Sequence, residues 1–113
     1  MTSFEKKDLI LNIVDDMKAE RISTLDVHQK TSIADYFIVC SGNSDVHINA
    51  IAGKVSEKLR DMGMKPSHLE SKGGGWVLID YGDIILHIMK EETRQFYDLE
   101  SLWEMMNPHP DLA

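Results

Sequence analysis

Several features that mark special classes of protein are scarce in this sequence. It contains one cysteine, Cys40, so an internal disulfide is impossible, which fits a reducing compartment. The longest apolar run, residues 36–40, is far shorter than the ~18 residues that a membrane span requires. The opening residues, MTSFEKKDLI, lack the apolar centre of a signal peptide. We therefore expect a cytoplasmic protein that does not enter the membrane.

Basic residues are also in short supply. The chain has 12 Lys and Arg against 19 Asp and Glu, which gives a net charge of −7. Binding to a phosphate backbone requires clustered Lys and Arg, so we expect little direct contact with nucleic acid. An acidic protein is instead attracted to basic protein partners. With 113 residues, 42% of them hydrophobic, we predict a single domain over residues 1–106 and a short tail over 107–113.

The order of apolar patterns predicts an α/β fold. Thr2 and Glu5 have the spacing of a capping box at the start of a helix, and Ser44 suits the N-cap of a second helix that Gly63 ends. A strand at 35–41 is apolar on both sides, which is typical of a central strand. A helix that crosses between strands favours a mixed sheet with flanking helices. The remaining expected elements are strands at 22–27, 65–70, 76–80 and 83–90, a loop at 71–75, and a helix at 93–106.

The last two strands form a predicted hairpin whose two sides differ in composition. Tyr81-Gly82 is the expected two-residue turn. One side is aliphatic core, whereas the other carries Trp76, Asp80 and His87 around further apolar residues. An apolar centre edged by polar groups is typical of a protein-binding patch. The alternative is that the last helix covers this side and makes Trp76 a core residue.

Tyrosine is an unusual residue for a tight turn. A two-residue turn would point the Tyr81 ring outward. Because turn positions with positive φ favour Asn, Asp or Gly, a tyrosine is costly there, and we expect it to act as an interface anchor. The alternative is that the ring folds back and packs over the hairpin.

No group of residues has the pattern of a catalytic site. Asp80 and Asp83 could approach each other across the turn, but no third acid is obvious for a two-metal centre. The glycines at 73–75 lack the spacing of a phosphate-binding loop. His87 is read more simply as a hydrogen-bonded structural histidine. We predict no catalytic residue, no metal site and no cofactor.

Two blocks of sequence resemble the ribosomal silencing factor family, also called Iojap-like. The first is DYFIVCSGNS at 35–44 followed by AIA at 50–52, and the second is WVLIDYGD at 76–83 followed by His87 and Arg94. The resemblance spans about residues 4–106. The chain departs from the family pattern at 45–47, where an Arg-Gln pair is common, and at Ser71, where Glu-Gly would be usual after Glu70.

The resemblance implies a nucleotidyltransferase-like α/β fold and a translational repressor without enzymatic activity. Such a protein binds the large ribosomal subunit through its fourteenth ribosomal protein and blocks joining of the small subunit. A large-subunit assembly factor is one alternative, and a divergent nucleotidyltransferase, suggested by the turn at 41–44, is another. The sequence is compatible with either a monomer or a homodimer. The candidate partner-binding residues are Glu70, Trp76, Asp80, Tyr81, Asp83 and His87.

Overall fold

Five strands and three helices make up the described part of the chain. The computed structural model describes residues 1–29, 34–72 and 75–97. The helices are α1 (Ser3–Asp16), α2 (Asp45–Asp61) and α3 (Glu91–Tyr97). The strands are β1 (Glu20–Asp26), β2 (Tyr36–Gly42), β3 (His68–Lys72), β4 (Trp76–Asp80) and β5 (Ile84–Lys90).

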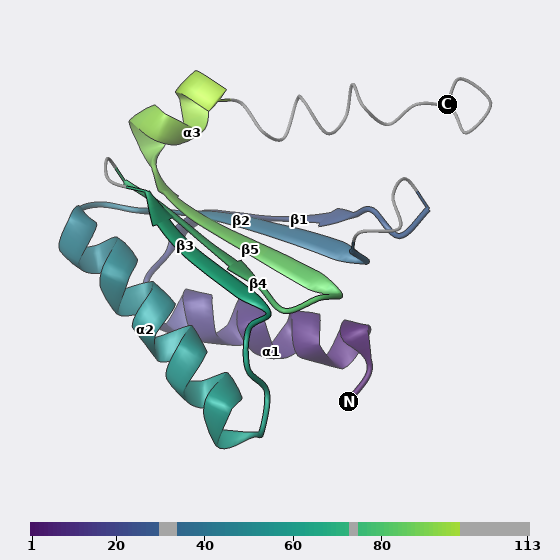
Figure 1. Ribbon diagram of the computed structural model, residues 1–113. Helices are drawn as coiled ribbons and strands as arrows, with labels where there is room; N and C mark the ends of the chain where they lie inside the picture. Colours follow the sequence, from purple (N-terminus) through teal and green to yellow (C-terminus); the bar gives the residue numbers. More distant parts are fainter. Residues whose placement is uncertain (30–33, 73–74, 98–113) are drawn as a thin grey trace.

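The strands form one mixed sheet in the order β1-β2-β5-β4-β3 (Figure 1). β2 and β5 run parallel to each other, and the other neighbouring pairs are antiparallel. β2 therefore has a neighbour on both sides, as its two apolar faces predicted, and β3 lies at an edge. The predicted α/β class with a mixed sheet and flanking helices is confirmed.

Helices α1 and α2 pack together against one face of the sheet, whereas α3 lies on the opposite side (Figure 1). The main core lies between the sheet and the first two helices. Thr2 and Glu5 form the predicted capping box of α1, and the Ser44 side chain accepts a hydrogen bond from the His47 amide at the start of α2. The core side chains from the strands include Ile38, Cys40, Val77, Ile79, Leu86 and Ile88.

The β4–β5 turn lies one residue later than the sequence pattern predicts. The Tyr81 amide donates to the Ile84 carbonyl at 2.8 Å, so these residues close the hairpin and Gly82 and Asp83 form its two-residue loop. Gly82 has φ +90°, which suits glycine at the first loop position of a type II′ turn. The predicted Tyr81-Gly82 turn is therefore wrong, because glycine occupies the first of its two central positions rather than the second.

This shift reverses the expected direction of the Tyr81 ring. Tyr81 continues the alternation of Val77 and Ile79 and lies in the main core, with 7% of its surface exposed. Its hydroxyl is enclosed without a hydrogen bond of normal geometry, although Ser56 of α2 faces it. Burial raises the pKa of the phenol, and Ser56 opposes part of that rise. The expectation of an outward-pointing ring is therefore wrong. The ring packs, as the alternative proposed, but it lies in the main core instead of folding back over the hairpin.

Several element boundaries differ from the predictions by one to three residues. β3 extends to Lys72, into the expected loop, and α3 begins at Glu91, two residues before the expected start. The remainder of the predicted last helix, residues 98–106, and the tail at 107–113 lie outside the described residues. Within the described residues, no helix combines the length and the apolar character needed to cross a membrane.

Candidate functional site

Four of the six candidate residues lie on one side of the sheet. We call this side, turned away from α1 and α2, the outer face, and define it by Glu70, Trp76, Leu78, Asp80 and His87. The register pairs Glu70 with Leu78 and Leu78 with His87, and directly opposed residues of antiparallel strands share a face. The hairpin alternation predicted from the sequence is therefore confirmed, because the main core takes up the other side of these strands.

His87 is the centre of an aromatic cluster on the outer face. The indole Nε1–H of Trp76 donates to His87 Nδ1 at 3.2 Å. The imidazole ring also lies 5.7 Å from the ring of Phe37 on β2, in a tilted arrangement. These contacts connect three strands and hold the Trp76 side chain in a defined position. The predicted role of His87 as a hydrogen-bonded structural histidine is confirmed.

The protonation state of His87 follows from its burial. Only 6% of the residue is exposed, and removal from water lowers the pKa of the imidazole from 6.5 to about 4. The ring is therefore neutral at neutral pH. Because Nδ1 accepts the proton of Trp76, the ring's own proton belongs on Nε2. The centre of the outer face is thus uncharged, and its acidic groups lie toward its edge.

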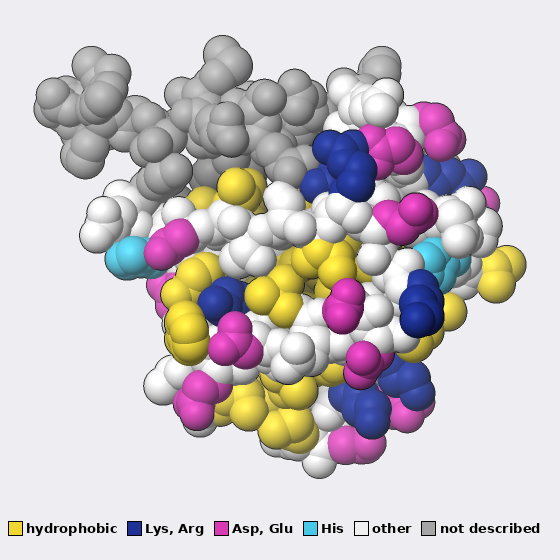
Figure 2. Space-filling model, turned by 180° about the vertical axis from the view of Figure 1, so that it is seen from behind, with side chains coloured by type: hydrophobic (Ala, Val, Ile, Leu, Met, Phe, Trp, Pro, Cys, Tyr) yellow, Lys and Arg dark blue, Asp and Glu magenta, His cyan; other side chains and the backbone are white. Residues whose placement is uncertain are grey.

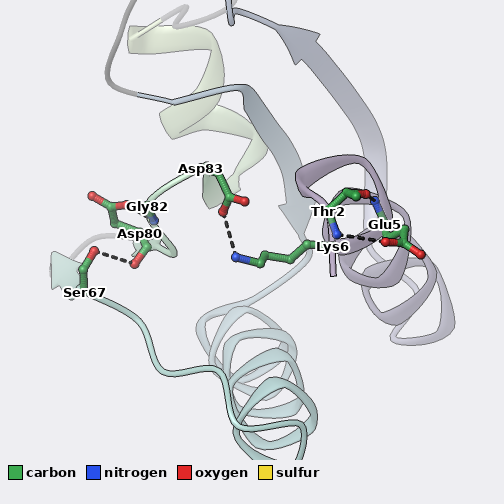
Figure 3. A network of polar contacts seen from close by, with 7 residues as sticks. All are labelled: Thr2, Glu5, Lys6, Ser67, Asp80, Gly82 and Asp83. Atoms are coloured by element: carbon green, nitrogen blue, oxygen red, sulfur yellow. Dashed lines mark hydrogen bonds and ion pairs between the residues drawn. The ribbon is translucent and has the colours of Figure 1, made fainter.

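The two aspartates of the hairpin do not converge on a common site (Figure 3). Asp80 accepts a hydrogen bond from the Gly82 amide at 2.7 Å through its side chain, which stabilises the turn. The Asp83 carboxylate instead pairs with Lys6 of α1 at 2.8 Å. The possibility that these carboxylates meet across the turn is therefore wrong, since each has a different partner. Asp83 lies at the end of the hairpin and connects it to α1.

Glu70 lies on the edge strand, opposite Leu78. It is partly exposed, and its carboxylate lies 3.6 Å from the imidazole of His68 on the same strand. It extends the outer face to the β3 edge of the sheet and contributes an acid there. Tyr81 lies on the helix-covered side and is not part of the outer face.

Sequence reasoning missed the contribution of β1 and β2 to the outer face. A second buried cluster there consists of Val27, Ala34, Phe37 and Ile85, with Leu25 and Leu78 packed against it. The apolar character of β2 on both sides was the available signal, but the register that places Phe37 beside Ile85 depends on a pairing of distant segments. The apolar part of the outer face is therefore wider than the hairpin alone.

A polar cluster at the end of β2 was also missed. Arg94 of α3 is 3% exposed and donates to Ser41 Oγ at 3.0 Å and to the Arg21 carbonyl at 2.5 Å. Ser41 in turn donates to Glu91 at 3.2 Å. The only signal for Arg94 in the sequence was its place in a family motif. Its contacts fasten the first turns of α3 to β1 and β2.

Charge is dispersed over much of the remaining surface. Figure 2 shows acidic and basic side chains interspersed with hydrophobic ones on the rear of the molecule. Among the described residues, no group of three or more His, Cys, Asp or Glu side chains is placed to hold a metal ion. The arrangement of the outer face thus provides an apolar, aromatic centre with carboxylates beside it. Such a surface suits contact with another macromolecule.

Comparison with known proteins gives this geometry a family context. The whole chain, residues 1–113, matches the family described as "Ribosomal silencing factor during starvation". A ribosomal silencing factor of Halalkalibacterium halodurans is 38% identical over 104 residues, which cover 91% of this chain and 89% of the relative. A crystal structure of a Chromobacterium violaceum protein superposes with a TM-score of 0.88 at 34% identity, covering 92% of this chain and 88% of the other.

A more distant mouse relative is named mitochondrial assembly of ribosomal large subunit protein 1. It is 26% identical over 110 residues, and the match covers 94% of this chain but only 48% of the mouse protein. The family description names a silencing factor and no enzymatic activity. Because the match extends over the full sequence and the bacterial relatives align over most of their own length, this chain belongs to the ribosomal silencing factor family.

Proposed function

We propose that this protein represses translation by binding the large ribosomal subunit and blocking access of the small subunit. The match of the entire chain to the silencing-factor family carries this proposal. The contact on the large subunit is its fourteenth ribosomal protein. The mechanism is steric, since a protein bound on the joining surface excludes the other subunit by the volume that it occupies.

The outer face is the surface that we assign to this contact. Its Trp76 is half-buried and already held by His87, so binding would fix few additional torsions of that side chain. Aromatic anchors with polar groups around them account for much of the affinity in protein interfaces. Glu70 and Asp80 supply negative charge beside this centre, which suits a basic ribosomal protein. The net charge of −7 would accelerate the encounter at low ionic strength.

Sedimentation with purified subunits tests the proposal directly. The protein should comigrate with mature large subunits, and its addition should lower the yield of joined ribosomes when small subunits follow. Equal binding to both isolated subunits, or joining that proceeds unchanged with the large subunit saturated, would contradict a steric block.

Substitution on the outer face tests where contact occurs. Trp76→Ala should weaken large-subunit binding by at least about thirtyfold, which corresponds to about 2 kcal/mol for a central aromatic anchor. Leu69→Ala is the matched control, because Leu69 is an exposed apolar residue of the same sheet that faces the other way. Melting temperatures of both variants identify any loss that is due to unfolding. Equal effects of the two substitutions on binding would contradict the assignment of the ribosome contact to the outer face.

A role in large-subunit assembly is the second candidate, and the name of the mouse relative favours it. An assembly factor would bind precursors of the large subunit in preference to mature particles. The two functions therefore separate in one competition experiment, in which labelled protein is offered equal amounts of immature and mature large subunits.

A further inference from the structure

The two parallel strands end beside each other, and the chain leaves them toward opposite sides of the sheet. β2 leads to α2 on the helix-covered side, whereas β5 leads directly to α3 on the other side (Figure 1). In open α/β sheets, such a divergence leaves a crevice at the carboxyl ends of the strands, and ligands commonly bind there. Here the crevice is a pocket of about 250 Å³ that Arg21, Ser41, Asn43, Glu91 and others line.

The floor of this pocket is a preformed polar network. Ser41 is 2% exposed and connects the buried Arg94 guanidinium to the Glu91 carboxylate. Desolvation raises the pKa of Glu91, but it is outweighed by the hydrogen bond from Gln95, the charge of Arg21, the hydrogen bond from Ser41 and the charge of Arg94. The net effect is a lowered pKa. Glu91 is therefore ionised at neutral pH and fixed in position. The pocket offers a defined carboxylate at its base.

The contact of Arg21 shows that the Glu91 carboxylate binds a guanidinium group. Its guanidinium, which is more than half exposed, forms an ion pair with Glu91. The backbone at Arg21 has φ +49°, a left-handed conformation that is costly for a residue with a side chain and is often retained near functional sites. An exposed ion pair of this type contributes little free energy, so a guanidinium from another molecule could replace it.

Two further carboxylates at the rim would favour such a ligand. Glu20 and Glu92 both line the pocket and are exposed. Together with Glu91 they outnumber the cationic groups at the site, Arg21 and the buried Arg94. Guanidinium has five donors in a planar fork and can bridge several carboxylates, whereas an ammonium is a compact point charge. The geometry points to a binding site for an arginine side chain of a basic polypeptide at the ends of β2 and β5.

This site is separate from the outer-face residues and goes beyond the proposed repression of translation. N-acetyl-arginine amide serves as the probe, and N-acetyl-citrulline amide is its uncharged isostere. Amide chemical shifts of the intact protein should change at residues 41–43 and 91–92 with the arginine probe and remain constant with citrulline. Equal shifts with both probes, or shifts elsewhere only, would overturn the proposal.

Substitutions at the pocket test which residues bind the arginine probe. Glu20→Gln combined with Glu92→Gln should weaken arginine binding at least about tenfold, whereas Glu57→Gln, an exposed acid of α2, should leave it unchanged. Arg21→Gly removes the internal competitor and suits the positive φ, so binding should become several-fold tighter. Weaker binding in the Arg21→Gly protein with unchanged melting temperature would contradict the proposal, as would inorganic phosphate shifting the same amides more than arginine. None of these measurements involves ribosomes, so their failure would leave the proposed repression unaffected.

Discussion

The buried imidazole of His87 predicts how the stability of this protein depends on pH. In the unfolded chain the ring takes up a proton near pH 6.5, but in the folded protein it does so only near pH 4. Between these values the unfolded state binds more protons, so the free energy of unfolding decreases as pH falls. A difference of about 2.5 pKa units corresponds to about 3 kcal/mol, all of which is present at pH 7 and lost on acidification to pH 4.

Urea denaturation at several pH values between 7 and 5 measures this effect. The window avoids the carboxylates, such as Glu91, whose pKa is lowered and whose contribution disappears only at more acidic pH. Below pH 6, the free energy of unfolding should fall by close to 1.4 kcal/mol per pH unit from this one group. Fluorescence reports the transition, and linear extrapolation gives the free energy in water.

Two variants isolate the contribution of His87. His87→Gln removes the titrating group but keeps an acceptor for the Trp76 indole, so its unfolding free energy should have a slope that is shallower by about one proton. His68→Gln is the control, because His68 lies exposed on the edge strand and should retain the slope of the natural protein. If His87→Gln keeps the full slope, His87 titrates normally and the assigned burial effect is wrong.

Substitutions at three other positions test the hairpin and the β2–α2 connection by denaturation. Tyr81→Phe should leave the free energy of unfolding unchanged or raise it by up to about 1 kcal/mol, because it removes an enclosed hydroxyl. Tyr81→Asn should lower the free energy of unfolding by about 3 kcal/mol, because it removes a core ring. Unchanged stability of the Tyr81→Asn protein would contradict the core position of the ring. Gly42→Ala should cost about 1–3 kcal/mol, since a Cβ would lie 2.6 Å from Ile48 Cγ1, and an unchanged stability would show that α2 adjusts freely. Lys6→Ala should cost less than about 1 kcal/mol, as the Lys6–Asp83 pair is partly solvated, and a larger loss would indicate a greater role in fixing the turn.

Local patterns in the sequence were sufficient for most of the secondary structure. The capping box at Thr2, the N-cap at Ser44 and the positive φ of Gly63 each depend on residues within a few positions of one another. The prediction of the β4–β5 turn was wrong for a similarly local reason. Both Tyr81-Gly82 and Gly82-Asp83 contain glycine, and only the register of β4 against β5 decides between them. A shift of one residue then moved Tyr81 from the surface to the core.

The candidate site was predictable only in part. Alternation within β4 and β5 placed Trp76, Asp80 and His87 on one side because a strand has a period of two. The neighbours from β2 were not predictable in this way, since β2 and β5 are separated by α2, β3 and β4 in the chain. The same holds for the contact of Arg94 with Ser41, which joins residues 53 positions apart. Patterns within one element do not encode such long-range pairings.

The burial of His87 and the proposed use of Trp76 as an anchor are physically connected. A neutral imidazole can accept the indole proton through Nδ1, whereas a protonated ring would have no acceptor and the hydrogen bond would be lost. The low pKa of His87 therefore keeps Trp76 oriented throughout the neutral range. An anchor that is ordered before binding loses less conformational entropy when the partner arrives. Trp76→Phe keeps an aromatic ring but removes the N–H donor, so it should weaken large-subunit binding less than Trp76→Ala. Equal losses in the two variants would assign the whole effect to the indole hydrogen bond instead of the buried ring.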